Sequence, residues 1–262
     1  MSQLANAFQS ADSDFSDQPV GDPKRCSPKI VVPKGCDYLK KPYTVEAPQR
    51  NFDRIRGKSK LGAPTAGKYT FPGDVAPSDA VVYEVKVKGR KVKLIMPKSG
   101  APVGKHLPTA QQAAKSLGCV PGKQLDSIQQ VVVSPNQNPS DAFWATQYNT
   151  PGFTSAATGG NGGVTFYPSA SPSKQAFVDS TMIHEGGHTF ASDLWKDAKK
   201  KKAWEIAMKK DKHSPSTYAD SSTDEDFSES LVMYSLSRGT KCEAAAKKLY
   251  PARYKALNQM FK

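Results

Sequence analysis

The 262-residue chain lacks a long hydrophobic run, since no apolar stretch approaches the roughly 20 residues that a membrane-spanning helix needs. Its first residues, MSQLANAFQSADSDFSDQP, show neither the basic nor the apolar region of an ordinary secretory signal peptide. We therefore expect no membrane span. We expect secretion, or delivery into a target cell, by a route that does not depend on a signal peptide; the alternative is that a signal has been trimmed.

Cysteine is scarce, and none of the 4 cysteines belongs to a CxxC pair of the kind that zinc ribbons use. This absence argues against a structural zinc knuckle. Cys26 and Cys36 flank a short stretch that would close into a disulfide loop in an oxidising compartment. The alternative is four reduced thiols, which would then include Cys119 and Cys242.

Acidic residues are too few to balance the basic ones, because 24 Asp and Glu face 37 Lys and Arg and leave a formal charge of +13. Such a charge attracts anionic surfaces, among them nucleic acid, phospholipid and cell-wall polymer. The lysine runs KDAKKKKAW and AMKKDKH lack the interleaved aromatic residues of a single-strand binding platform. We interpret them as solvated helix faces and do not expect nucleic acid as a partner.

The chain divides by composition into two parts. Residues 1–75 are rich in Pro, Gly, Lys and Ser and show little periodicity, so we predict a loop-rich N-terminal extension with little regular structure. Residues 76–262 are long enough to bury one core and carry periodic patterns. We expect them to form a single α+β domain with its helices concentrated toward the C-terminus.

The first half of that domain has strand patterns. VVYEVKVKGRKVKLIM predicts a β-hairpin that turns at Lys88-Gly89, and a helix capped by Thr109 and stopped by Gly118 follows. SIQQVVVSP predicts a strand, and PSDAFWATQY a brief helix. The glycine-rich TSAATGGNGG predicts a loop that leads into an edge strand over residues 164–168, which a proline closes.

The second half has helix signals. Ser171 and Pro172 predict the start of a helix that runs to about Ala191, and a second helix is expected over residues 197–210. Ser222 to Glu225 has the S-x-x-E form of a capping box, which predicts another helix start. Two further helices follow, the last beginning at Pro251.

The helix over residues 171–191 contains the sequence HEGGH. His184 and His188 are four residues apart, so they lie on one helical face and can bind one ion, typically zinc. Glu185 follows His184 and is therefore rotated from it by about 100° around the helix axis. This position suits it to act as the general base for a zinc-bound water. Gly186 and Gly187 each cost about 1 kcal/mol relative to alanine in a helix. We therefore expect a closely packed neighbour, either residues 164–167 or the loop around Tyr218.

A catalytic zinc site needs a third protein ligand. A histidine six residues beyond His188 would indicate a metzincin, but Leu194 occupies that position and excludes the class. Spacing alone leaves several downstream candidates open, namely His213, Asp220, Asp224, Glu225, Asp226 and Glu229. We also consider His213 as a bystander or substrate contact, and we expect His106 at the surface.

HEGGH followed by YADSSTDEDFSE resembles the anthrax lethal factor-like zinc metallopeptidases, and the bacterial Pro-Pro endopeptidases are similar in the same elements. The resemblance implies a zincin-like domain with a small sheet, an active-site helix and one Zn²⁺ per chain. It implies His184, His188 and Glu225 as zinc ligands. It further implies Glu185 as general base and Tyr218 as the phenol that stabilises the oxyanion.

The resemblance is clear over residues 180–234, weaker upstream to Leu107 and absent over the first 75 residues. Gly187 matches the glycine of the family motif, and Glu229 matches a second acid that would support the site without binding the metal. These matches are specific for metal and reaction but not for substrate.

Three functions follow as hypotheses. The first is a zinc endopeptidase that acts on a protein or peptide, as a bacterial effector or toxin with a secretion machine or an immunity protein as partner. The second is a hydrolase of peptidoglycan peptides, which the positive charge favours. The third is a non-enzymatic basic binding module.

Overall fold

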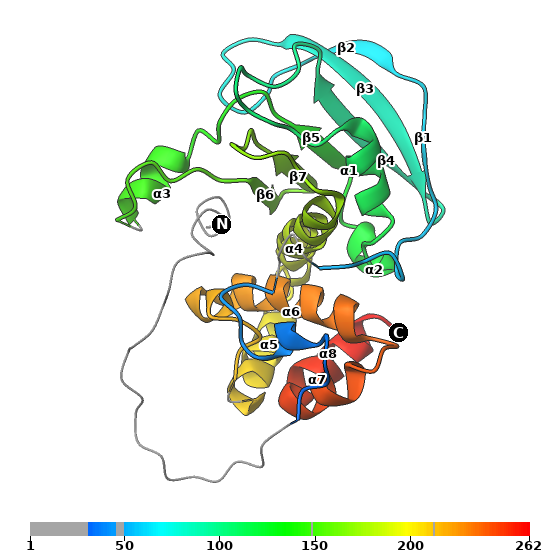
Figure 1. Ribbon diagram of the computed structural model, residues 1–262, viewed down its shortest axis with the longest axis vertical. Coiled ribbons are helices and arrows are strands. Elements are labelled where there is room, and N and C mark those ends of the chain that lie inside the picture. Colours follow the sequence, from blue (N-terminus) through cyan, green and yellow to red (C-terminus); the bar gives the residue numbers. More distant parts are fainter. Residues whose placement is uncertain (1–30, 46–49, 148, 212) are drawn as a thin grey trace.

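The computed structural model describes residues 31–45, 50–147, 149–211 and 213–262. It confirms the α+β class. One mixed sheet and a group of helices pack against a long central helix, α4 (Gln175–Leu194) (Figure 1). Among the described residues, no helix has both the length and the apolar character needed to cross a membrane.

Seven strands of the described chain form the sheet, in the order β1-β3-β4-β5-β7-β6, with β2 also paired to β3. β5 is parallel to both of its neighbours, and the other pairs are antiparallel. The predicted hairpin is confirmed, since Lys88 and Gly89 turn with φ of 47° and 77°. The strands are β1 (Ser59–Leu61), β2 (Thr65–Tyr69), β3 (Ser78–Val87), β4 (Arg90–Pro97), β5 (Gln130–Val133), β6 (Ala157–Gly160) and β7 (Gly163–Phe166).

β1 and β2 lie within the segment that we expected to have little regular structure, so that expectation is wrong for residues 59–69. Both strands pair with β3, and neither contains a buried residue. They are held by main-chain hydrogen bonds rather than by a buried apolar face. A search for hydrophobic alternation therefore has no pattern to find there.

The prediction of a loop over TSAATGGNGG is also wrong. This segment contains β6 and the turn that joins β6 to β7 in a hairpin. Asn161 and Gly162 make this turn with φ of 47° and 77°. The edge strand is β6, and β7 lies one strand further in. The glycines that suggested a loop have a packing reason, since a Cβ on Gly159 would lie 1.9 Å from the carbonyl oxygen of Glu185.

The predicted helices agree with the structure in kind and nearly in extent, whereas α2 and the two 3₁₀ helices were not predicted. Thr109 and Gln112 form a capping box, and α4 begins at Gln175, a few residues later than expected. The remaining helices are α1 (Ala110–Leu117), α2 (Gly122–Leu125), α3 (Asp141–Gln147), α5 (Ala198–Asp211), α6 (Thr223–Ser237), α7 (Glu243–Leu249) and α8 (Pro251–Met260). Two short 3₁₀ helices, η1 (Asp37–Leu39) and η2 (Tyr218–Ser221), complete the set.

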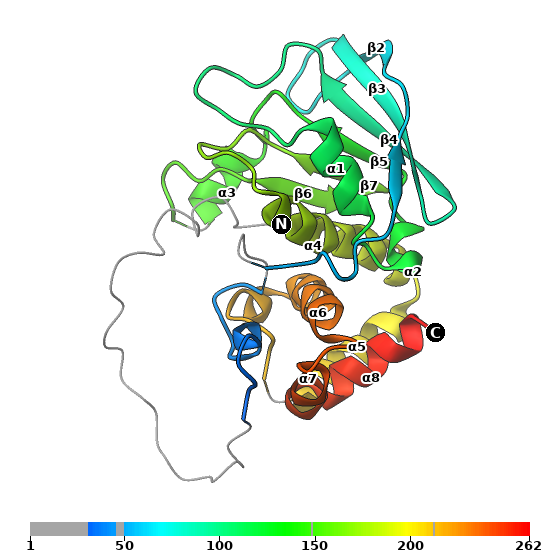
Figure 2. The ribbon, with the colours of Figure 1, turned by 45° about the vertical axis from the view of Figure 1, so that its right-hand side comes forward.

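Helix α4 lies between the sheet and the C-terminal helices (Figures 1 and 2), and every residue from Val178 to Ala191 is buried. β6 and β7 pack on one side and α6 on the other. The neighbours expected for the two glycines are wrong. A Cβ on Gly186 would meet Ile128 at 2.9 Å, and one on Gly187 would meet the Ser228 hydroxyl oxygen at 2.8 Å. Gly187 thus lets α4 and α6 approach closely.

The cysteine expectations are also wrong. Cys36 forms a disulfide with Cys242, at a sequence separation of 206 residues, so Cys36 is not paired with Cys26 and the thiols are not all reduced. Cys26 itself lies outside the described residues. Cys119 is a buried free thiol, and burial raises its pKa to about 12.

Candidate metal centre

Two helices bring the predicted ligands together. α4 carries His184 and His188 one turn apart, and the first turn of α6 carries Glu225. Glu225 Oε2 lies 3.1 Å from His184 Nε2 and 3.3 Å from His188 Nε2, and the two histidine nitrogens are 3.2 Å apart. All three side chains are buried, and together they could hold one metal ion.

The capping role and the ligand role of Glu225 use different atoms. Ser222 caps α6 by accepting a hydrogen bond from the Glu225 main-chain N–H at 3.1 Å. The Glu225 carboxylate contacts the two histidines instead. Burial by itself would raise the pKa of Glu225, but His188 and His184 outweigh it and hold this pKa well below its usual range.

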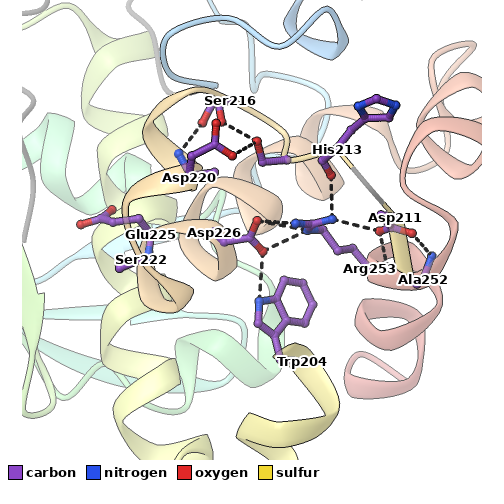
Figure 3. Close-up of polar contacts among 12 residues, drawn as sticks. Trp204, Asp211, His213, Ser216, Asp220, Ser222, Glu225, Asp226, Ala252 and Arg253 are labelled. Atoms are coloured by element: carbon purple, nitrogen blue, oxygen red, sulfur yellow. Dashed lines mark hydrogen bonds and ion pairs between the residues drawn. The ribbon is translucent and has the colours of Figure 1, made fainter. Parts of the chain in front are cut away.

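Two other acids of the segment, Asp224 and Asp226, have partners elsewhere. Asp226 follows Glu225 but points to a different side of α6, where it accepts hydrogen bonds from Arg253 and Trp204 (Figure 3). Asp224 accepts one from the indole of Trp195 at 2.6 Å. Neither acid therefore joins the histidines.

The two remaining loop candidates also lie away from the cluster. Asp220 is exposed and forms an ion pair with Lys41 at 2.8 Å. His213 is exposed too, and its main-chain carbonyl accepts a hydrogen bond from Arg253 (Figure 3). This arrangement favours the bystander role for His213. His106 is at the surface, as expected.

Glu229 lies one turn after Glu225 on α6 and contacts the other nitrogen of His184, with 3.0 Å between Oε1 and Nδ1. A carboxylate is an acceptor, so Nδ1 carries the proton and the Nε2 lone pair is available to bind a metal. Glu229 also accepts hydrogen bonds from the Thr44 hydroxyl and the Val45 main-chain N–H. Nothing in the sequence pointed to Thr44 and Val45.

Glu185 is fully buried, and neither of its carboxylate oxygens has a hydrogen-bond partner in the described part of the chain. A buried carboxylate without a partner is costly, so its presence indicates a site built for a proton or a charged ligand. β6 passes close by, at Gly159. Tyr167 lies near enough for the Glu185 charge to contribute to a raised Tyr167 pKa, for which burial is the main cause.

Tyr218 lies beside the cluster at the start of η2. Its side chain is buried, and its ring stacks on the His184 ring with centroids 6.0 Å apart and an interplanar angle of 21°. The structure thus brings four of the predicted site residues, His184, His188, Glu225 and Tyr218, together between α4, α6 and η2. His184 is central to this arrangement, because it contacts Glu225, Glu229, His188 and Tyr218.

Comparisons with known proteins leave the family open. No protein-family model matches the chain, and a search of curated proteins finds no match either. The resemblance to the anthrax lethal factor-like metallopeptidases therefore stays a prediction. What can be argued about function depends on the geometry of the candidate metal centre.

Proposed function

We propose that this chain is a zinc-dependent endopeptidase with a zincin-like active site. The observation that carries the proposal is the convergence of His184, His188 and Glu225, together with the buried, unpartnered carboxylate of Glu185, the residue that follows His184 on α4. Three ligands with an adjacent free carboxylate are the parts needed to activate a water molecule for hydrolysis.

The spacing of the three ligand atoms supports zinc. Zinc binds nitrogen and carboxylate oxygen at about 2.0–2.2 Å, and tetrahedral geometry at such bond lengths places neighbouring ligand atoms about 3.3–3.5 Å apart. The three observed separations, 3.1, 3.2 and 3.3 Å, lie close to this range. Two imidazoles also make a magnesium or calcium site improbable, since these ions prefer oxygen ligands.

Zinc bound by these residues would supply Lewis acidity, which polarises a carbonyl and lowers the pKa of a bound water toward about 7. Glu185 then accepts the proton of the attacking water and passes it to the leaving amine nitrogen. Its burial keeps other donors from competing for this carboxylate. The phenol of Tyr218 donates a hydrogen bond to the developing oxyanion, and its stacking on His184 supports this role.

The edge strand β6 offers a place for an extended peptide. On one side β6 pairs with β7, and no described strand pairs with its other side. The main chain of β6 touches α4 at Glu185, so a peptide paired with this open edge would pass the general base. The absence of a side chain at Gly159 makes this approach possible.

The test begins with the metal content of the purified full chain and its activity on a peptide library. We expect about one zinc per chain and cleavage within peptides rather than at their ends. Glu185→Gln should keep the zinc and lose about 10²–10⁴-fold in turnover, as expected when a general base is removed. A chain that binds zinc but cleaves no peptide or protein would contradict the proposal.

A peptidoglycan peptide is the second candidate substrate, and the charge of +13 favours it because cell-wall polymers are anionic. Incubation with purified sacculi and with a panel of denatured proteins would separate the two substrates. A non-enzymatic basic module would instead bind its partner in a salt-sensitive way that Glu185→Gln leaves unchanged.

We also propose that the protein acts outside the cell that makes it, as an effector or toxin. The Cys36–Cys242 disulfide supports this, because such bonds persist in oxidising compartments. Thiol labelling of the protein recovered from the medium and from cells should find the bond intact only in the medium. Equal oxidation in both fractions would remove this support.

A further inference from the structure

A short N-terminal segment, residues 41–45, lies against the metal centre, and we name it the strap. It runs beside the loop that leads into η2. The carbonyl oxygens of Pro42 and Tyr43 accept hydrogen bonds from the main-chain N–H groups of Thr217 and Tyr218, at 2.9 and 2.8 Å. The Tyr43 ring also stacks on the Tyr218 ring, with centroids 6.4 Å apart. The strap thus fixes both the main chain and the ring of Tyr218.

The next two residues of the strap hold Glu229. The Thr44 hydroxyl lies 3.0 Å from each Glu229 carboxylate oxygen, and the Val45 main-chain N–H donates to Oε2 at 2.5 Å. Thr44, Val45 and Glu229 are all buried, so water does not compete for these bonds. Oε1 of the same carboxylate faces His184 Nδ1 at 3.0 Å.

These contacts form a continuous path from the strap to a metal ligand. Glu229 selects the tautomer of His184 and the orientation of its ring only while its own carboxylate is held in place. α6 fixes the Glu229 backbone, but the donors from the strap fix how the carboxylate is turned. The strap therefore acts on His184 through Glu229, without a contact of its own to the metal.

The strap is anchored to the C-terminal helices. Cys36, just before η1, is bonded to Cys242 at the start of α7, and the Tyr250 hydroxyl donates to the carbonyl oxygen of Leu39 at 3.3 Å. Lys41 pairs with Asp220 of η2. Figure 2 shows this blue segment beside α6 and α7.

We propose that the strap is a positioning element of the metal centre: Thr44 and Val45 set His184 through Glu229, Tyr43 sets Tyr218, and the Cys36–Cys242 disulfide holds the strap in place. The part that concerns Tyr218 rests on the proposed function. The part that concerns His184 requires only that the three ligands bind a metal, so it can be tested by metal affinity.

The experiment measures zinc affinity of the full chain by competition with a chromophoric chelator. Thr44→Val keeps the shape of the side chain but removes the hydroxyl donor, and it should raise the zinc Kd about 10-fold, in the range found for groups that support a metal ligand. Thr44→Ser restores the donor and should return the Kd to within about twofold of the wild type. Thr65→Val, at an exposed position of β2, is the matched control and should change nothing.

Melting of the metal-free proteins separates positioning from general stability. The loss of zinc-binding free energy in Thr44→Val should exceed the loss of folding stability that the lower melting temperature of its metal-free form indicates. If Thr44→Val does not fold, Thr44→Ala removes the same hydroxyl without adding a methyl group and replaces it. A folded Thr44→Val or Thr44→Ala protein with wild-type zinc affinity would overturn the proposal, and so would a Thr44→Ser protein that binds zinc as weakly as Thr44→Val.

The Cys36→Ser, Cys242→Ser double variant tests the anchor, and we expect a weaker zinc affinity than in Cys119→Ser, its matched control. Unchanged affinity in the double variant would refute the anchoring role. The proposed endopeptidase function fails on a different result, namely a wild-type protein that binds zinc tightly but cleaves nothing. In that case the zinc affinities of the Thr44 variants still test whether the strap positions His184.

Discussion

Glu185→Gln should make the metal-free protein more stable while it removes the activity. Glu185 is 0% exposed, and both carboxylate oxygens lack partners among the described residues. A buried unsatisfied amide costs about 1–3 kcal/mol, whereas an unsatisfied charged group costs more. The two side chains have nearly the same shape, and the contact with Gly159 involves only the Glu185 main chain, so the substitution leaves this packing unchanged. We therefore expect a net gain of at least about 1 kcal/mol.

For a chain of this size, about 1 kcal/mol corresponds to a rise of about 2–4 °C in Tm. The assay is calorimetry of chelator-treated wild type and variant, repeated with saturating zinc. The gain should shrink when zinc is bound, because the nearby positive charge then compensates the carboxylate. A metal-free variant that melts below the wild type would show that the carboxylate has partners in the fold, and would refute the reasoning. Glu205→Gln, on α5, is the matched control for the loss of one charge at a partly exposed position.

Three further predictions follow from the contacts. Glu225→Ala should lower the zinc content measured by metal analysis. Asp224→Ala, which changes the neighbouring acid outside the cluster, should leave the zinc content unchanged. Unchanged zinc in Glu225→Ala would assign the third ligand to another residue. Tyr218→Phe should keep zinc bound and slow turnover by about 10²-fold, and an unchanged rate would remove its oxyanion role. Arg253→Met should destabilise the fold by about 3–5 kcal/mol in urea denaturation, because it leaves Asp226 charged, buried and without its main partner.

The sequence predicted the parts of this site that local spacing controls. The separation of four residues between His184 and His188 places both on one helical face, whatever surrounds the helix. The Ser222 cap and the Lys88-Gly89 turn depend on neighbours within the chain, and both are present. Glu225 was identified by resemblance, and spacing alone left it among six candidates. The structure selects it because its carboxylate lies against the Nε2 atoms of both histidines, whereas Glu229 contacts Nδ1 of His184.

The remaining features depend on contacts between distant segments. β6 was predicted as a loop because its glycines disfavour a strand, yet Gly159 is glycine to admit the main chain of Glu185. The Cys36–Cys242 pairing and the contact of Thr44 with Glu229 join residues about two hundred positions apart. No local pattern marks such contacts, so the strap could be found only in three dimensions.

The Cys36–Cys242 bond sets an order of events for the newly made protein. Cys242 is incorporated 206 residues after Cys36, so the disulfide cannot form until almost all of the described chain has been made. A loop of that length restricts the unfolded chain by about 5 kcal/mol in the chain-entropy model. If the disulfide holds the strap as proposed, a nascent or reduced copy would lack the anchor that keeps the Thr44 and Val45 donors on Glu229.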